Sequence, residues 1–220
     1  MTDDQLAKNK GASMYRLYGF STQNTMKVLY VLEELGCNFE FKTVDLSKGE
    51  QRKPEFLKIN PVGKTPALQH NDFCLFESGA ICRYLANVEE SSLYPEDKMK
   101  RAQVDQWMDY FTSHLGRWLS SLFFEQFIKP GFGLGTPDEA KCKEAEKFAR
   151  DQFVAVEQCL GESTYLVGEE LTIADLFAFA YIEQVQALKF DISAYPNVQT
   201  WLNKIEKRES IQKARKLLKT

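Results

Sequence analysis

Two short polar stretches stand where helices are expected to begin, and both carry groups that suit an anion. One is Glu77-Ser78, directly before the helical pattern of Ile81 and Leu85, and the other is the stretch STQN at residues 21–24. A helix that begins at a serine or threonine offers a hydroxyl and unpaired backbone N–H groups, and its dipole favours negative charge there. The same residues would also serve as plain helix caps without any ligand.

A third feature is the dipeptide Thr65-Pro66, which follows Lys64 and precedes a short apolar stretch. Proline cannot donate to a β ladder, so it is found at a sheet edge or at the first residue of a strand. We therefore expect a strand to begin at this point, with the Thr65 main chain in the loop before it.

The elements that must position these residues can be read from the spacing of apolar residues in the first 88 residues. The pattern predicts strand, helix, strand, short helix, two strands around a turn, and a final helix. The first helix is expected to end at Gly36, and the last carries Ile81, Leu85 and Val88 on one face. The expected elements are strands at 14–20, 38–46, 66–68 and 73–75, a helix after residue 24, a helical or irregular stretch at 49–60, and the last helix up to residue 88.

The pattern changes after residue 88. Residues 89–98 are mostly polar, include Pro95, and are expected to form a linker, and beyond them only helical spacing of apolar residues is found. Thr172 and Asp175 have the spacing of a capping box, with aspartate in the place of the usual glutamate. The sequence thus predicts a polar tail (1–13), an α/β domain with the order βαβαββα (14–88), a linker (89–98) and an all-helical domain (99–220), with helices at 98–128, 139–160, 173–188 and 198–217.

Composition limits the possible functions. The chain has 220 residues with 28 basic and 31 acidic side chains, and a net charge of −3 gives no reason to expect nucleic acid as a partner. No apolar run is long enough to cross a bilayer, and the polar start MTDDQLAKNKGAS does not resemble a secretory signal. Five cysteines without a CxxC pair, and only two histidines, favour reduced thiols, a cytoplasmic location and no metal site.

Four motifs resemble those of the cytosolic-type glutathione transferases. They are STQNTMKVLYVLEELG, NPVGKTPAL, LFESGAICRYLA and LTIADLFAF, and the resemblance extends from about residue 14 to residue 218. The helical half is closest to the phi class, whereas Thr22-x-Asn24 is similar to the bacterial nu type. The resemblance implies a thioredoxin-like first domain, a helical-bundle second domain, glutathione as co-substrate, no metal, and a homodimer.

The resemblance also implies where glutathione binds. Ser78 would bind the γ-glutamyl carboxylate, Glu77 the γ-glutamyl ammonium group, and Lys64 a carboxylate at the glycine end. A cis peptide bond before Pro66 would turn the Thr65 N–H and C=O toward the peptide backbone of glutathione. The implied set is Gln51, Lys64, Thr65, Pro66, Glu77 and Ser78.

The thiol of glutathione must be ionised, and residues 21–24 are implied to do this. Lowering a thiol pKa from about 8.5 by roughly two units requires about 3 kcal/mol. One hydrogen bond to a charged group contributes about 1.5–3 kcal/mol and a helix N-terminus about 0.3–1 kcal/mol, so a neutral donor there suffices. Thr22 and Ser21 both remain candidates, with Asn24 as a second donor, whereas Tyr18 is two residues out of register.

The second substrate is expected to be hydrophobic. Trp118 and Phe123 lie on a helix that borders the electrophile pocket in the family, although an aromatic stripe at helical spacing is also typical of a core. The principal prediction is a glutathione S-transferase that activates the thiol of glutathione for attack on hydrophobic electrophiles. The alternatives are a glutathione-dependent disulfide or peroxide reductase of nu type, and a transferase-like binding module without catalysis.

Overall fold

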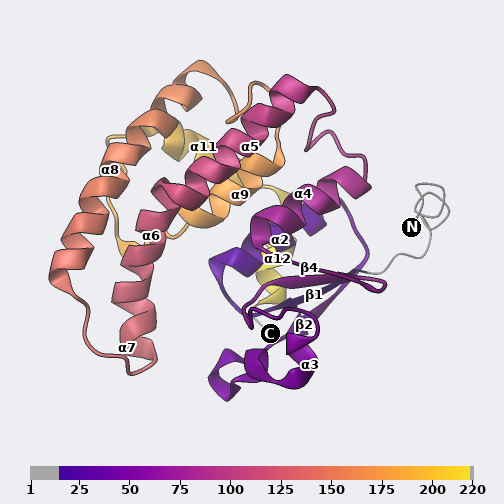
Figure 1. Ribbon diagram of the computed structural model, residues 1–220. Coiled ribbons are helices and arrows are strands. Elements are labelled where there is room, and N and C mark those ends of the chain that lie inside the picture. Colours follow the sequence, from indigo (N-terminus) through magenta and orange to yellow (C-terminus); the bar gives the residue numbers. More distant parts are fainter. Residues whose placement is uncertain (1–14, 219–220) are drawn as a thin grey trace. The chain divides into compact units, whose positions relative to one another are not determined.

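The computed structural model describes residues 15–218 (Figure 1), so the predicted polar tail lies outside the described residues. The chain divides into two compact units. Unit 1 contains the residues up to Glu89 together with those from Ser210 onward, and unit 2 contains Glu90 to Glu209. Unit 1 carries the four-stranded sheet and unit 2 is helical, as the sequence predicts.

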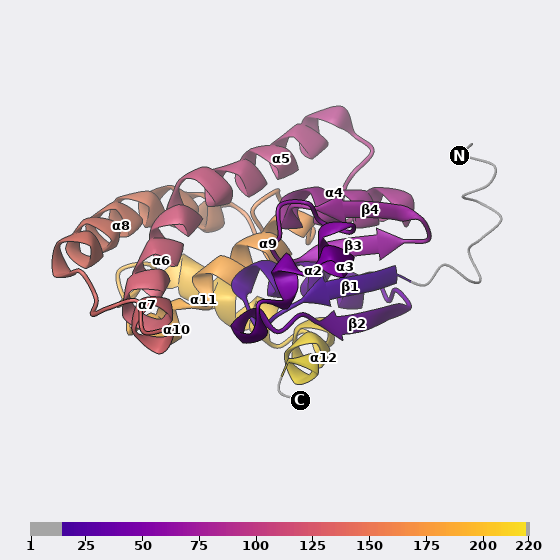
Figure 2. The same cartoon turned by 60° about the horizontal axis from the view of Figure 1, so that its bottom comes forward.

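The sheet of unit 1 has the strand order β2-β1-β3-β4, which can be followed in Figure 2. Strands β1 and β2 are parallel, and β3 is antiparallel to both β1 and β4. The sheet and its helices confirm the predicted βαβαββα order. The elements are β1 (Tyr15–Gly19), α2 (Gln23–Glu34), β2 (Phe39–Thr43), η1 (Leu46–Lys48), η2 (Glu50–Arg52), α3 (Pro54–Leu57), β3 (Ala67–His70), β4 (Phe73–Phe76) and α4 (Ser78–Val88).

The alternation of side chains along β1 explains how the sheet is covered. Tyr15 and Leu17 are almost fully buried, and Tyr15 contacts the end of α4 through a hydrogen bond to Glu89. Tyr18 points to the opposite face, where its ring lies 6.3 Å from that of Phe56 in α3. Because side chains alternate between the two faces of a strand, α2 and α4 cover one face and α3 covers part of the other.

Unit 2 is built around α9 (Ile173–Ile182), whose ten residues are all buried. A helix that is apolar on all sides is stable only when other helices surround it, and α5, α6 and α11 pack against it. The remaining elements of this unit are α5 (Lys98–Ser113), α6 (Leu115–Phe123), the π-helical turn η3 (Phe124–Ile128), α7 (Lys129–Gly131), α8 (Glu139–Glu162), α10 (Val185–Leu188) and α11 (Pro196–Glu206).

Three of the expected helices are broken in the structure. The stretch 98–128 is interrupted at His114, whose backbone (φ −120°, ψ −98°) is not helical, and the stretches 173–188 and 198–217 are each divided into two helices. At the first break Gly116 has no room for a Cβ, which would lie 2.2 Å from the carbonyl oxygen of Phe111 and 2.6 Å from the Tyr181 ring. The chain after this break therefore requires glycine at position 116, and the apolar spacing continues through the break.

The last helix, α12 (Glu209–Leu217), belongs to unit 1 by its contacts, whereas the sequence pattern groups it with the helical segment 99–220. Ile211 and Ala214 are fully buried, and the Ser210 hydroxyl donates to the Glu34 carboxylate at the end of α2. The amphipathic spacing of α12 predicts that one of its faces is buried. The fold determines that this helix belongs to unit 1, where Ser210 contacts Glu34 of α2.

The predicted capping box at the start of α9 is confirmed. The Thr172 backbone N–H donates to Asp175 Oδ2 at 3.0 Å, and the Thr172 side chain accepts from the backbone of Asp175. The other oxygen of Asp175 accepts from the Leu166 N–H at 2.9 Å and from the Trp201 indole at 3.0 Å. Asp175 is fully buried, so this carboxylate joins three parts of unit 2 in addition to capping the helix.

Candidate functional site

The sheet register brings the candidate segments to one end of unit 1. Tyr18 near the end of β1 pairs with Ala67 at the start of β3, and Ala67 pairs with Phe76 at the end of β4. The residues after β1, before β3 and after β4 are therefore neighbours: they are 21–24, Thr65-Pro66 and Glu77-Ser78. Because β2 is parallel to β1 and Thr43 pairs with Gly19, the segment that leads to Gln51 leaves the sheet at the same end.

The dimensions of this end suit a short extended peptide. Neighbouring strands lie about 4.8 Å apart, so the segments after β1 and after β4 are separated by roughly 10 Å, with Thr65 between them. An extended tripeptide spans about 10 Å. Three segments with polar groups therefore lie within a span that matches the length of a tripeptide.

The α4 helix begins at this end with unpaired donors. Ser78 is 9% exposed, and the first main-chain bond of the helix runs from the Ile81 N–H to the Glu77 carbonyl at 2.9 Å. Within residues 15–218 no protein acceptor is found for the N–H groups of Ser78, Gly79 and Ala80, and Glu77 gives no side-chain cap. These groups and the Ser78 hydroxyl can bind a carboxylate.

The conformation of Glu77 could not be read from the sequence. Its φ of 70° and ψ of 114° place a residue with a full side chain in a region that usually requires glycine. Such a backbone costs about 1–3 kcal/mol and is retained mainly at binding and catalytic sites. This strained turn joins β4 to α4 and sets the direction in which α4 begins.

The loop before β3 is ordered by Asn60, a residue that sequence reasoning did not select. Asn60 is 2% exposed, its side-chain Nδ2 donates to the Lys64 carbonyl at 2.6 Å, and its Oδ1 accepts from the Val62 N–H at 3.0 Å. The Thr65-Pro66 peptide is cis, as the resemblance implies. Thr65 is half-buried, and among the described residues its N–H and C=O have no protein partner.

Gln51 lies beside this loop. A Cβ on Gly63, which has a φ of 65°, would come within 3.1 Å of the Gln51 carbonyl oxygen, so the two backbones are in close contact. The Gln51 Oε1 atom is buried and has no hydrogen-bond donor in the described part of the chain. A buried acceptor without a donor is uncommon in folded proteins and points to a missing partner.

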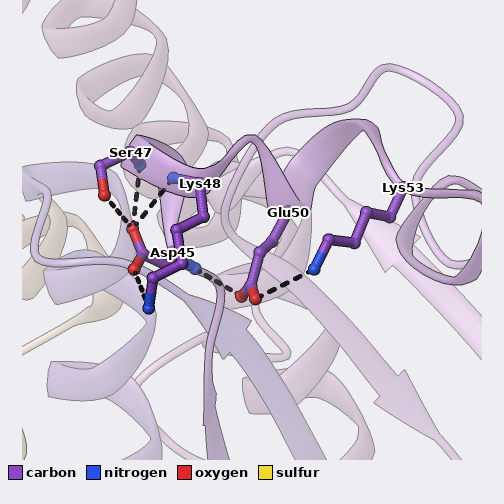
Figure 3. A network of polar contacts seen from close by, with 5 residues as sticks. All are labelled: Asp45, Ser47, Lys48, Glu50 and Lys53. Atoms are coloured by element: carbon purple, nitrogen blue, oxygen red, sulfur yellow. Dashed lines mark hydrogen bonds and ion pairs between the residues drawn. The ribbon is translucent and has the colours of Figure 1, made fainter.

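A polar network on both sides of Gln51 holds its segment in place (Figure 3). Asp45 accepts from the Ser47 hydroxyl at 2.6 Å and from the Ser47 N–H at 2.9 Å, and Glu50 accepts from the Asp45 N–H at 2.9 Å. The Ser47 and Lys48 bonds lower the pKa of Asp45 to about 2. The carboxylate is therefore ionised at neutral pH, and the network is complete there.

The start of α2 carries the thiol candidates. Thr22 is the N-cap, and its Oγ1 accepts from the Thr25 N–H at 3.3 Å, whereas Ser21 is exposed and precedes the cap. Asn24 is half-buried, and its Oδ1 accepts from the Lys27 ammonium at 2.7 Å. An amide whose oxygen is occupied in this way presents its N–H groups on the other side, which suits an anionic ligand.

Lys27 is an unusual residue in this environment because it is only 1% exposed. Burial holds its pKa well below the ordinary value, and the nearby Cys82 and Glu77 groups oppose this shift.

Tyr18 is a further candidate donor to the thiol, but it is two residues out of register in the sequence. In the structure its hydroxyl donates to the Gln69 side chain at 3.0 Å.

The protein's own thiols are poorly suited to nucleophilic chemistry. All five cysteines are free, and burial is the largest cause of a raised pKa for each of them. The pKa of Cys37 and that of Cys82 are raised to about 12. Because the thiolate is the reactive form, the raised pKa values make these cysteines weak nucleophiles at neutral pH.

The two residues expected to contact a hydrophobic substrate lie in unit 2 and do not share one face. Trp118 stacks on Phe148 of α8 with ring centroids 4.7 Å apart, whereas Phe123 stacks on Phe127 at 4.9 Å. Phe123 lies five positions after Trp118 in the helix, which turns their side chains about 140° apart. Both side chains are partly exposed.

Over residues 15–218 the structure contains no group of three or more histidine, cysteine, aspartate or glutamate side chains arranged to hold a metal ion. None of its helices there is long and apolar enough to cross a membrane.

Comparison with known families agrees with this geometry. The family model described as "Glutathione S-transferase, N-terminal domain" matches residues 13–87, and the one described as "Glutathione S-transferase, C-terminal domain" matches residues 111–209. The chain belongs to the glutathione S-transferase family, and it is a glutathione transferase enzyme of the cytosolic type with a thioredoxin-like and a helical domain.

Its relatives include fungal and plant proteins. Glutathione S-transferase hmp2 of Hypomyces subiculosus is 35% identical over 205 residues, which cover 90% of this chain and 96% of the relative. Probable glutathione S-transferase GSTF2 of Oryza sativa subsp. japonica is 32% identical, with 93% and 97% covered. The crystal structure of poplar glutathione transferase F1 has a TM-score of 0.87 at 31% identity, with 94% of this chain and 99% of that chain covered. These similarities support the transferase prediction, and nothing in them favours the reductase or the binding module.

Proposed function

We propose that unit 1 binds glutathione in an extended form across the end of its sheet and ionises its thiol for attack on a hydrophobic electrophile. The observation that carries this proposal is the convergence of three segments through the register Tyr18–Ala67–Phe76. The three segments supply a hydroxyl at a helix cap, a free main chain and a second helix N-terminus.

The proposed orientation follows from charge. The γ-glutamyl carboxylate lies at the start of α4 on Ser78, and Glu77 accepts from the ammonium group next to it. The cysteinyl main chain pairs with the N–H and C=O of Thr65. The glycyl carboxylate reaches the exposed Lys64, and an N–H of the ligand supplies the donor that the Gln51 Oε1 atom lacks.

The thiolate accepts hydrogen bonds from Thr22 and from the Asn24 amide. Thr22 is favoured over Ser21 because it is the cap residue itself and its hydroxyl is held by Thr25, whereas Ser21 is exposed. The electrophile contacts an apolar side chain, and since Trp118 and Phe123 do not share a face, only one of these two candidates can serve. The enzyme contributes position and charge stabilisation, and no covalent enzyme intermediate is required.

We further propose that the enzyme works in the cytoplasm as a homodimer without a metal. Free cysteines with raised pKa values are compatible with a reducing compartment. Light scattering of the purified protein should give twice the mass of the 25.3 kDa chain.

Calorimetric titration with glutathione tests the proposal directly. We expect saturable binding at millimolar concentrations or below, and binding of S-methylglutathione as well, because that analogue keeps both carboxylates and the peptide backbone. The matched control is the peptide Glu-Cys-Gly with an ordinary α linkage, which displaces the ammonium and carboxylate groups and should bind far more weakly. Equal affinity for the two linkages, or no heat with glutathione, would contradict the proposed orientation.

The reaction is tested by comparing two assays on the same preparation. We expect conjugation of glutathione to an aryl halide to exceed the uncatalysed rate, with release of halide. Reduction of a model disulfide by glutathione should be slower. Reduction without measurable conjugation would instead support the nu-type reductase.

A further inference from the structure

Thr25 carries a buried hydroxyl beside the candidate thiol site, and the proposed function gives it no role in ionising the thiol. It is the third residue of α2, its side chain is 0% exposed, and its Oγ1 lies 3.1 Å from the Oγ1 of Thr22. Sequence reasoning selected Ser21, Thr22 and Asn24 and passed over this residue.

The position of the Thr25 side chain is fixed by its surroundings. A Cβ on Gly19 would lie 2.5 Å from the Thr25 methyl group and 3.0 Å from its hydroxyl, so the side chain packs directly against the backbone of β1. The Thr25 Oγ1 also accepts from the Phe20 N–H at 3.4 Å. The hydroxyl therefore has little freedom to turn away from Thr22.

Counting donors and acceptors gives the direction of the hydroxyl pair. A threonine hydroxyl has one proton and two acceptor positions. The Thr25 proton is shielded from solvent and needs an acceptor, and in the described part of the chain the acceptor recorded within reach is Thr22 Oγ1. If Thr22 donated to Thr25 instead, the buried Thr25 proton would remain without a partner, which is the costlier arrangement.

With Thr25 as donor, Thr22 receives two hydrogen bonds. Its Oγ1 accepts from the Thr25 N–H at 3.3 Å and from the Thr25 hydroxyl at 3.1 Å. Both acceptor positions of Thr22 are then filled, so its own proton can only be donated outward. Hydrogen bonds in a chain polarise one another, so a hydroxyl that already accepts is a better donor.

We propose that Thr25 is a positioning residue that directs the Thr22 hydroxyl proton toward the sulfur of bound glutathione. This inference rests on the proposed function, because it requires the sulfur to lie against Thr22. Thr25 touches no substrate atom and acts only through the Thr22 hydroxyl. Lys27 of α2 and the Glu77 carboxylate that interacts with it are left unchanged in the test below.

The test is an ultraviolet titration of the thiolate in the glutathione complex of the full chain. The hydroxyl is removed without loss of shape in Thr25→Val and kept without the methyl group in Thr25→Ser. We expect Thr25→Val to raise the thiol pKa by about half to one unit, as loss of one neutral hydrogen bond implies, and Thr25→Ser to leave it unchanged. Thr22→Ala should raise it by about one to two units. Circular dichroism checks folding, and Thr25→Ala is a second variant without the hydroxyl.

The double variant separates positioning from general disturbance. Because Thr25 acts through Thr22, Thr22→Ala/Thr25→Val should show the same thiol pKa as Thr22→Ala alone. Two outcomes would overturn the inference while leaving the proposed function in place: an unchanged pKa in Thr25→Val beside a raised one in Thr22→Ala, or equal shifts in Thr25→Val and Thr25→Ser. A further rise in the double variant would also overturn it. An unchanged pKa in Thr22→Ala would refute the assignment of the thiol to Thr22, and the inference with it.

Discussion

At the scale of single residues, the candidate site combines ordinary capping groups with two unusual features. Ser78 and Thr22 sit at helix starts, where such residues are common without any ligand. Glu77, by contrast, has a backbone with φ of 70°, and Gln51 carries a buried oxygen without a donor. These two features are costly in a free protein, and both are compatible with the proposed glutathione site at the same end of the sheet.

The Ser78→Ala variant should lose glutathione affinity and keep its stability. Removing one hydrogen bond to a carboxylate costs about 1.5–3 kcal/mol, so the dissociation constant should rise roughly 10- to 150-fold. The midpoint of denaturant unfolding should stay nearly constant, because the described residues give the Ser78 hydroxyl no protein partner. Titration calorimetry measures the first quantity. Ser121→Ala in α6 is the control, and unchanged affinity in Ser78→Ala would show that the γ-glutamyl end lies elsewhere.

At the scale of elements, buried polar side chains that join one strand or helix to another contribute to stability. His70 in β3 is buried, its ring lies 4.5 Å from that of Tyr15, and its Nδ1 lies 2.9 Å from the Tyr84 hydroxyl of α4. Burial lowers the pKa of His70, and Glu89 partly opposes this shift. The neutral imidazole is therefore the form that fits the folded protein.

This pKa shift predicts that unit 1 loses stability in mild acid. The unfolded chain takes up the His70 proton near pH 6.5, before the folded one does, so the free energy of unfolding should fall as the pH drops from about 6.5 toward the lower folded pKa. His70→Asn keeps a polar atom near Tyr84 and should remove this part of the pH dependence. Urea unfolding at several pH values measures it, and identical pH profiles for the two proteins would argue against the shift.

Replacing Asp175 should destabilise unit 2 far more than removing a simple cap. Asp175→Ala leaves the N–H groups of Leu166 and Thr172 and the Trp201 indole without their acceptor. Each buried donor left unpaired costs about 1–3 kcal/mol, so the three donors together should lower the free energy of unfolding by at least about 3 kcal/mol. Thr172→Ala should lose only about 1 kcal/mol. Denaturant unfolding compares them, and similar losses in both variants would mean that Asp175 serves only as a cap.

At the scale of the whole molecule, unit 1 is not contiguous in sequence, because the chain returns to it with α12 after the continuous unit 2. Ile211 of α12 is fully buried in unit 1, and Ile205 of α11 is fully buried in unit 2. The two residues are only six positions apart, yet they belong to different cores.

This arrangement predicts different consequences for two similar substitutions. Ile211→Ala and Ile205→Ala should each lower stability by about 2–5 kcal/mol. Hydrogen exchange should locate the loss of protection in the strands of unit 1 for Ile211→Ala and in α9 and α11 of unit 2 for Ile205→Ala. The same pattern of lost protection in both variants would show that α12 does not stabilise unit 1 separately.

The sequence by itself determined the type and order of the elements, the capping box and the residue types of the candidate site. Periodicity and caps are local properties, so the start of α4 at Ser78 and the end of α2 before Gly36 could be read directly. The cis bond at Thr65-Pro66 was expected only from the family resemblance.

Tertiary structure decided the features that depend on contacts between distant residues. The break at His114 is accompanied by a close approach at Gly116, and α12 is accompanied by the complete burial of Ile211. The convergence of Thr22, Thr65 and Ser78 is set by strand register, which pairs residues about 50 positions apart in β1 and β3. No local pattern encodes such a pairing, because it forms only when the whole sheet closes around a shared core.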